Sequence, residues 1–218
     1  MAALYPRDIR YEHPWPRCAR TIPIMIFDEF LVADELRSLL NYTLRNVSSF
    51  VRSEVVGYGS VSKQSTEDRR SRVLFELGPY DALFRQRLLT FLPHVLHALS
   101  KQPFPVIDLE IQLTASNHAE FFRAHTDSDD DELRGRELTF VYFFHREPRR
   151  FGGGELKIFD TVKTKSGPTA TERFQLVYPL QNQVVFFLSS YLHEILPVIC
   201  PSRDFADSRF TVNGWYRQ

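Results

Sequence analysis

The sequence predicts an α+β fold with a mainly β core. Two helical patterns come first, and from residue 106 onward short apolar segments follow one another, separated by polar, Gly and Pro residues. Aromatic residues make up 14% of the 218 residues, a content that favours strands and a large apolar core. Strands in such close succession are typical of a sandwich or a jelly roll.

The first 105 residues are expected to form a helical and mixed support region. Leucines at helical spacing predict helices over Glu35–Arg45 and Asp81–Leu99. Asp28 or Asp34 is the expected N-cap of the first helix, and Pro93 could kink the second. The remaining segments are an irregular arm over residues 1–20, a charged loop over Ser62–Ser71, and strands at Ile22–Phe27, Val51–Val61 and Val73–Leu77.

Residues 106–218 are expected to form the β core. Because neither half looks able to fold alone, one domain is expected over residues 1–218. The predicted core strands are Val106–Thr114, Phe121–His125, Leu138–Phe144, Leu156–Phe159, Phe174–Val177, Val184–Leu188, His193–Val198 and Phe210–Tyr216.

Composition argues against several classes of partner and compartment. Lys and Arg number 27, as do Asp and Glu, so no net charge favours nucleic acid or an anionic membrane. No apolar run approaches the roughly 18 residues of a membrane helix, and the first 20 residues lack the apolar centre of a signal peptide. Cys18 and Cys200 cannot form a disulfide framework, so a cytoplasmic protein is expected.

The pattern most suggestive of chemistry is His125-Thr126-Asp127, followed by His193 in a later strand. Side chains at positions i and i+2 of a strand share one face, so His125 and Asp127 can reach one point. A histidine from a distant strand would complete a set of two imidazoles and one carboxylate, the ligand set of non-haem Fe(II) oxygenases.

Several segments in sequence order resemble the prolyl 4-hydroxylase-like family of Fe(II)- and 2-oxoglutarate-dependent dioxygenases. Besides the His125-Thr126-Asp127 motif and His193, they are residues 138–144, the glycine-rich stretch 151–159, residues 193–198 and residues 209–215. The resemblance covers roughly residues 105–218. It implies a double-stranded β-helix, also called a cupin-like jelly roll, with helices packed on one sheet.

The resemblance also implies a set of site residues. His125, Asp127 and His193 would hold iron, and a basic residue on the last core strand would pair with the distal carboxylate of 2-oxoglutarate. Arg209 matches that position, six residues before Trp215, and Thr211 on the same strand face could add a hydroxyl. The implied cofactors are Fe(II), 2-oxoglutarate as cosubstrate and O2, with ascorbate as a candidate reductant.

Arg203 competes with Arg209 for the carboxylate. Arg203 follows His193 at the spacing commoner in the family, but it lies in a Pro-broken, polar stretch that is typical of a loop. Arg209 opens an alternating run in which Thr211, Asn213 and Trp215 share its face, so Arg209 is the expected residue.

The sequence also departs from the family. Ser116 stands where many members have a Tyr before the first iron ligand, and Phe143, beside Tyr142, stands where many have a second Tyr. The secondary contacts of 2-oxoglutarate therefore cannot be carried over. Residues Gly152–Gly154 lack the Lys-Ser/Thr of a P-loop and are expected to permit a tight turn or bulge.

The implied activity is hydroxylation of an unactivated C–H bond. The presence of Asp127 favours hydroxylation over halogenation, because related halogenases leave that position vacant for chloride. A peptidyl proline or another protein side chain is the expected substrate; the alternatives are a free amino acid, a natural-product intermediate or a non-catalytic binding module. No nucleic-acid or membrane partner is expected, the sequence says nothing of oligomeric state, and the candidate substrate-contacting loops are Ser53–Ser71, Ser128–Arg136 and Val162–Arg173.

Overall fold

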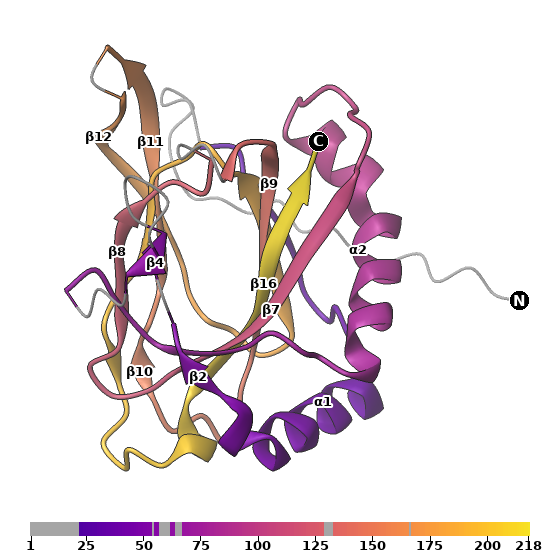
Figure 1. Cartoon of the computed structure of the whole chain (residues 1–218), viewed down its shortest axis with the longest axis vertical. Coiled ribbons are helices and arrows are strands. Elements are labelled where there is room, and N and C mark those ends of the chain that lie inside the picture. Colours follow the sequence, from indigo (N-terminus) through magenta and orange to yellow (C-terminus); the bar gives the residue numbers. More distant parts are fainter. Residues whose placement is uncertain (1–21, 54, 57–61, 64–66, 129–132, 166) are drawn as a thin grey trace, which may run out of the picture.

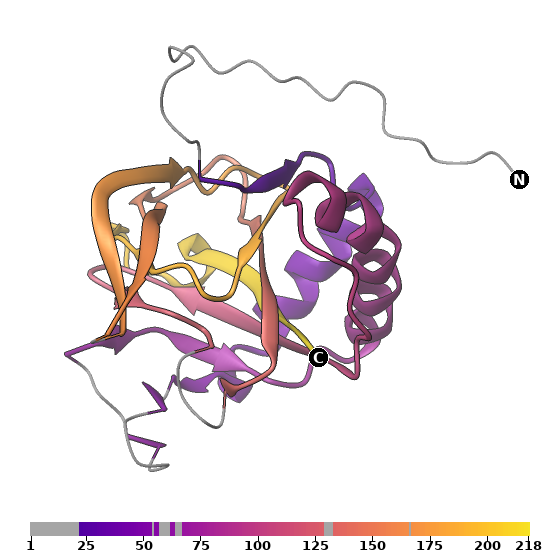
Figure 2. The same cartoon turned by 90° about the horizontal axis from the view of Figure 1, so that it is seen from above.

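Two antiparallel sheets pack face to face, and two helices cover the outer side of the larger sheet (Figures 1 and 2). The structure is a computed structural model that describes residues 22–218, except 54, 57–61, 64–66, 129–132 and 166. The arm predicted for residues 1–20, which includes Cys18, lies outside the described residues. The arrangement confirms the predicted mainly β core with helices on one sheet.

The larger sheet has seven strands in the order β1-β13-β9-β16-β7-β6-β2. Its central strands come from the C-terminal half, whereas β1, β2 and β6 come from the support region. The strands are β1 (Met25–Phe27), β2 (Val51–Arg52), β6 (Arg72–Leu74), β7 (Asp108–Ser116), β9 (Arg136–Phe144), β13 (Gln183–Leu188) and β16 (Arg209–Arg217).

The smaller sheet has five strands in the order β12-β11-β14-β8-β5. Two short pairs, β3 with β4 and β10 with β15, lie outside both sheets. The strands are β3 (Val55–Val56), β4 (Ser62–Lys63), β5 (Arg69–Arg70), β8 (Phe121–His125), β10 (Gly152–Gly153), β11 (Leu156–Thr164), β12 (Gly167–Val177), β14 (His193–Ile195) and β15 (Val198–Ile199).

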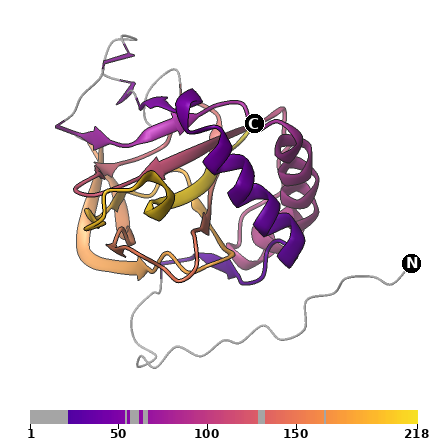
Figure 3. The ribbon, with the colours of Figure 1, turned by 90° about the horizontal axis from the view of Figure 1, so that it is seen from below.

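The helices α1 (Ala33–Arg45) and α2 (Pro79–Ala98) both lie on the outer side of the larger sheet and run in different directions (Figures 1 and 3). The predicted caps Asp28 and Asp34 are wrong. Helix α1 begins after Val32, and the Glu35 carboxylate accepts a hydrogen bond from the Val32 N–H at 2.9 Å. Pro93 lies within α2 without ending it. Within the described residues, no helix is long and apolar enough to cross a membrane.

Alternation along the central strands divides the protein interior into two layers. In β9, Phe140, Tyr142 and Phe144 pack in the cluster under the helices, whereas Val141 and Phe143 pack between the two sheets. Because both faces of the larger sheet are covered, its strands carry long apolar runs instead of alternating apolar and polar residues. The layer between the sheets leaves room for polar side chains at one end, where the candidate site lies.

Two predicted loops contain regular structure. Residues Val162–Arg173 belong to the β11–β12 hairpin, which projects beyond the rest of the molecule (Figure 1). Their polar composition resembles that of a loop because the hairpin end is largely exposed on both faces. Within Ser62–Ser71, two short strands form, and β5 adds to the edge of the smaller sheet. Of the strand predicted over Val51–Val61, the described part contains only β2 and β3.

The packing of α2 on the sheet gives a test of the fold. Phe84 is fully buried, and its ring lies 5.3 Å from that of Tyr142 in β9, centroid to centroid. We expect Phe84→Ala to lower the free energy of unfolding by about 3–5 kcal/mol, because removing this ring loses its buried contacts and leaves a cavity between the helix and the sheet. Leu89→Ala is the matched control: Leu89 is 47% exposed on the same helix, and its change should stay within about 0.5 kcal/mol. Equal losses in urea denaturation would contradict this packing.

Candidate metal centre

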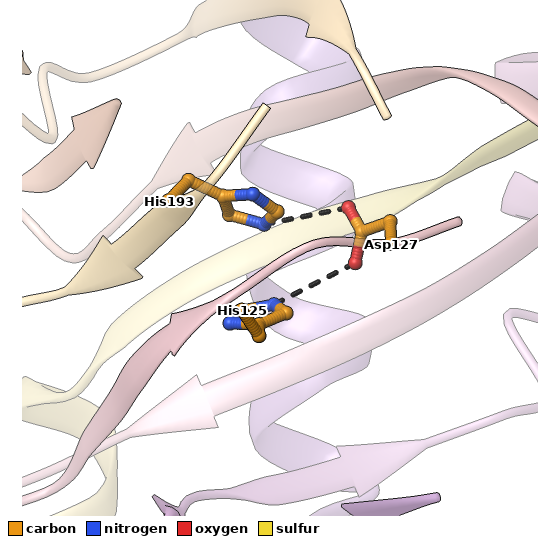
Figure 4. Close-up of side chains that lie close together, drawn as sticks. All are labelled: His125, Asp127 and His193. Carbon is orange, nitrogen blue, oxygen red and sulfur yellow. Dashed lines mark ion pairs between the residues drawn. The ribbon is translucent and has the colours of Figure 1, made fainter. Parts of the chain in front are cut away.

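The structure brings together the three side chains singled out by the sequence, although they come from different segments of the chain. His125 ends β8, Asp127 follows two residues later, and His193 begins β14. The strands pair with His193 opposite His125, which places the two imidazoles side by side. Figure 4 shows the Asp127 carboxylate beside the two rings, with one oxygen facing each imidazole.

The potential ligand atoms converge on one point. His125 Nε2 lies 3.6 Å from Asp127 Oδ1, and His193 Nε2 lies 3.3 Å from Asp127 Oδ2. One ligand atom from each of the three residues lies within 4.8 Å of the others. Among the described residues, this is the group whose His, Cys, Asp or Glu atoms could hold one metal ion.

Backbone carbonyls fix which nitrogen of each imidazole faces the centre. His125 Nδ1 lies 2.8 Å from the Arg123 carbonyl oxygen, and His193 Nδ1 lies 2.9 Å from the Tyr191 carbonyl oxygen. A carbonyl oxygen only accepts hydrogen bonds, so each Nδ1 donates and each neutral ring presents an Nε2 lone pair to the centre.

A hydrogen-bond chain holds the Asp127 carboxylate. Thr139 Oγ1 donates to Asp127 Oδ2 at 2.8 Å and lies 3.0 Å from Ser189 Oγ, while the Ser189 carbonyl oxygen accepts from the Asp127 N–H. Burial acts to raise the pKa of Asp127, but its interactions with His193 and His125 outweigh burial and hold that pKa well below its usual range. The carboxylate therefore stays ionised inside the protein.

A buried arginine lies on the same pocket. Arg209, the first residue of β16, is 2% exposed, and its Nε and Nη2 have no hydrogen-bond partner among the described residues. Burial lowers its pKa to about 9, with Glu155 acting in the opposite direction, so it stays charged at neutral pH. A buried charge without partners is costly, and this guanidinium is therefore suited to receive an anion.

Gly154 makes space for Arg209. A Cβ on Gly154, whose φ is +72°, would lie 2.7 Å from Arg209 Cδ, so only glycine fits both the conformation and the space. Where a tight turn or bulge was predicted over Gly152–Gly154, residues Gly152–Gly153 form the short strand β10, paired with β15, and Gly154 follows it. On its other side, the Arg209 guanidinium carbon lies 5.0 Å from the centroid of the Phe143 ring.

Alternate residues of β16 line the pocket floor, as the strand period requires. Thr211, Asn213 and Trp215 follow Arg209 along this face, and Thr211 Oγ1 lies 3.3 Å from Asn213 Oδ1. Ser116 pairs with Arg209 across the β7–β16 ladder and also lines the pocket. Tyr142 points away, toward the helices, and donates its hydroxyl to Asn182.

The competing arginine lies elsewhere. Arg203 is exposed in a turn, where its φ is +56° and its N–H bonds to the Cys200 carbonyl oxygen. It does not line the pocket formed by the described residues.

Sequence reasoning missed two features of the pocket. The β8–β14 register shifts between His125 and Phe122, so one extra residue in β8 turns both of these side chains toward the pocket. Phe122 then stacks on His125 with ring centroids 3.6 Å apart. Arg69 of β5 lines the pocket too; its strand has two residues within a charged run, a signal too short to recognise.

Comparison with known proteins supplies the family. Residues 111–217 match the model of the 2OG-Fe(II) oxygenase superfamily, where 2OG is 2-oxoglutarate. An uncharacterized PKHD-type hydroxylase from Synechocystis sp. is 36% identical over 191 residues, which cover 87% of this chain. By this match, residues 111–217 belong to the 2OG-Fe(II) oxygenase superfamily. The chain spans 61% of the length of the Synechocystis relative.

Solved structures agree on the fold. A prolyl-4-hydroxylase from Pseudomonas putida matches with a TM-score of 0.61 and 21% identity, covering 91% of this chain and 94% of that one. A Trichoplax adhaerens prolyl hydroxylase, in complex with a hypoxia-inducible-factor peptide fragment, matches with a TM-score of 0.64 and 15% identity, covering 90% and 84%. The predicted resemblance to prolyl 4-hydroxylase-like members of the superfamily is confirmed, and so is the jelly-roll fold.

Membership of this superfamily implies Fe(II), 2-oxoglutarate and O2. The donor set fits the metal, because two Nε2 lone pairs and a carboxylate all present acceptors to one point and need a cation. The two unpartnered nitrogens of Arg209 fit a carboxylate of the cosubstrate.

The burial of His193 predicts how stability depends on pH in the metal-free protein. Burial lowers the pKa of His193 from 6.5 to about 4, with Asp127 acting in the opposite direction and His125 adding to the shift. As pH falls from about 6.5 to about 4, the unfolded chain binds a proton at this histidine and the folded protein does not, so the free energy of unfolding should fall. Asp127, whose pKa is lowered, also contributes to the free energy of unfolding, but that contribution is lost only below the pH range in which His193 acts.

Urea titrations across this range, on wild type and His193→Gln, measure the effect. The variant lacks the titrating group and should show a shallower slope of stability against pH. Parallel slopes in the two proteins would contradict the burial of a neutral His193.

Proposed function

We propose that this protein is an Fe(II)- and 2-oxoglutarate-dependent dioxygenase that hydroxylates an unactivated C–H bond. The observation that carries the proposal is the convergence of His125 Nε2, His193 Nε2 and the Asp127 carboxylate in one pocket. The same pocket holds Arg209, two of whose nitrogens have no hydrogen-bond partner among the described residues. The alternative, a non-catalytic jelly-roll binding module, would have no need to keep these groups together.

Each side chain has a defined role in this proposal. His125, Asp127 and His193 would hold the metal. When bound, iron would supply the oxidation of the substrate C–H bond by O2, coupled to decarboxylation of 2-oxoglutarate to succinate and CO2. Because the Asp127 carboxylate stays ionised, it would offset part of the metal charge, and its presence favours hydroxylation over halogenation.

Arg209 and its surroundings orient the cosubstrate. The guanidinium would pair with the distal carboxylate of 2-oxoglutarate, at a depth where water is largely excluded and a charge pair is strong. Thr211, which lines the pocket beside it, is the candidate for an additional hydroxyl contact. Phe143, packed against the guanidinium, has no hydroxyl to offer the cosubstrate.

A peptidyl proline or another protein side chain is the proposed substrate. Support comes from the fold shared with the Trichoplax prolyl hydroxylase that binds a peptide fragment. We also propose that residues 1–218 form one catalytic unit, because β1, β2 and β6 of the first 105 residues complete the sheet on which Arg209 lies.

The metal ligands are tested by substitution. We expect Asp127→Ala, like either histidine-to-alanine change, to abolish succinate formation and to weaken Fe(II) binding by more than tenfold, since loss of groups that only support ligands already costs about 10–100-fold. His94→Gln is the control, because His94 is exposed on α2. Succinate release and mass spectrometry for products gaining one oxygen atom are the measurements, and near-normal turnover in Asp127→Ala would reject the proposal.

Titration of 2-oxoglutarate separates the two arginines. Removing one member of a buried charge pair costs about 2–5 kcal/mol, so Arg209→Ala should raise the concentration required by at least tenfold. Arg203→Ala should change it little, because Arg203 is exposed outside the pocket. The opposite ranking would show that Arg203 binds the cosubstrate.

A further inference from the structure

A second arginine lines the pocket from the edge of the smaller sheet. Arg69 in β5 pairs with Phe122 in β8, and both side chains line the pocket. Its neighbour Arg70 pairs with Phe121, which also lines the pocket, but Arg70 itself is exposed and is not among the pocket-lining residues.

Ser71 and Phe122 hold the Arg69 guanidinium through its Nε and its flat face, not through its two terminal nitrogens. Nε donates to Ser71 Oγ at 3.1 Å, and the guanidinium carbon lies 4.8 Å from the centroid of the Phe122 ring. Phe122 in turn stacks on His125. Within the part of the chain that the structure describes, neither terminal nitrogen of Arg69 has a hydrogen-bond acceptor.

Among the described residues that line the pocket, Arg69 has no acidic residue to itself. Asp127 is the acidic residue among the described lining residues. If the proposed function holds, Asp127 and the 2-oxoglutarate dianion together offset the charges of Fe(II) and Arg209. Arg69 then remains as a half-buried cation in the same pocket. Burial lowers its pKa to about 10, with Asp127 acting in the opposite direction, so it is charged at neutral pH.

We propose that Arg69 binds a carboxylate of the substrate and so selects acidic substrates for this pocket. The proposal rests on the proposed function and names a substrate class for it. A planar guanidinium held by Ser71 and Phe122 is preorganised for a carboxylate, and its position at the edge strand separates it from the deeper, fully buried Arg209. The carboxylate can belong to an acidic side chain of a peptide or to a free amino acid, and the test separates these sources.

The test measures binding without turnover, on the full chain loaded with Mn(II) in place of Fe(II) and with 2-oxoglutarate. One arm uses capped, proline-centred pentapeptides with Asp or Glu at flanking positions, each paired with its Asn or Gln isostere. The other arm uses N-acetylproline and its amide. Affinity selection with mass spectrometry gives the ratio of acid to amide affinity in each pair.

We expect wild type to bind the acid about tenfold more tightly than its amide in at least one arm, because a hydrogen bond between two charged groups is stronger than one to a neutral amide. Arg69→Gln should bring the ratio near one, Arg69→Lys should keep part of the preference, and Arg70→Gln should leave it unchanged. The affinity for 2-oxoglutarate should stay within about threefold in Arg69→Gln, which also shows that this variant is folded.

Several results would overturn the proposal: no acid preference in either arm, an unchanged preference in Arg69→Gln, or an equal loss in Arg70→Gln. Loss of 2-oxoglutarate binding in Arg69→Gln as large as in Arg209→Ala would make Arg69 a cosubstrate ligand instead. A preference confined to one arm identifies the source of the carboxylate. Because no step here needs turnover, absence of succinate formation by the Fe(II) protein would reject the proposed function separately.

Discussion

A carboxylate that stays ionised beside one buried and one half-buried imidazole is the constraint on which the rest of the structure depends. Asp127 and His193 are each about 5% exposed, so their charges and lone pairs are hardly solvated by water. Thr139 and the Ser189 backbone hold the carboxylate, and the backbone carbonyls of Arg123 and Tyr191 turn each imidazole so that Nε2 faces inward. Everything in this arrangement presents acceptors to one point, which only a cation satisfies well.

The fold supplies this arrangement by covering both faces of the larger sheet. Helices α1 and α2 bury one face with apolar side chains, and the smaller sheet covers the other. Because β16 alternates strictly, the same strand anchors the helices through Phe210 and Val212 and presents Arg209 and Thr211 to the pocket. The positions of metal ligands and cosubstrate cation are therefore fixed by two sheets that cannot shift without disturbing the cores.

Much of this could be predicted from the sequence, because strand alternation is a local signal and the matching segments follow one another in the family order. The alternating run that begins at Arg209 placed that residue on a strand, whereas the Pro-broken stretch placed Arg203 in a loop, where the structure has it. The predicted N-cap of α1 was wrong: the helix begins after Val32, whose N–H donates a hydrogen bond to the carboxylate of Glu35 within the helix. Arg69 and the β8 bulge could not be seen, because both depend on pairing between strands distant in sequence.

The most direct measurement is a crystal structure of the protein grown anaerobically with Fe(II) and 2-oxoglutarate. We expect one metal ion bound by His125 Nε2, His193 Nε2 and an Asp127 carboxylate oxygen, with one carboxylate of 2-oxoglutarate on the Arg209 guanidinium. A metal bound without Asp127, or 2-oxoglutarate held away from Arg209, would contradict the central claim that these four side chains form one metal and cosubstrate site.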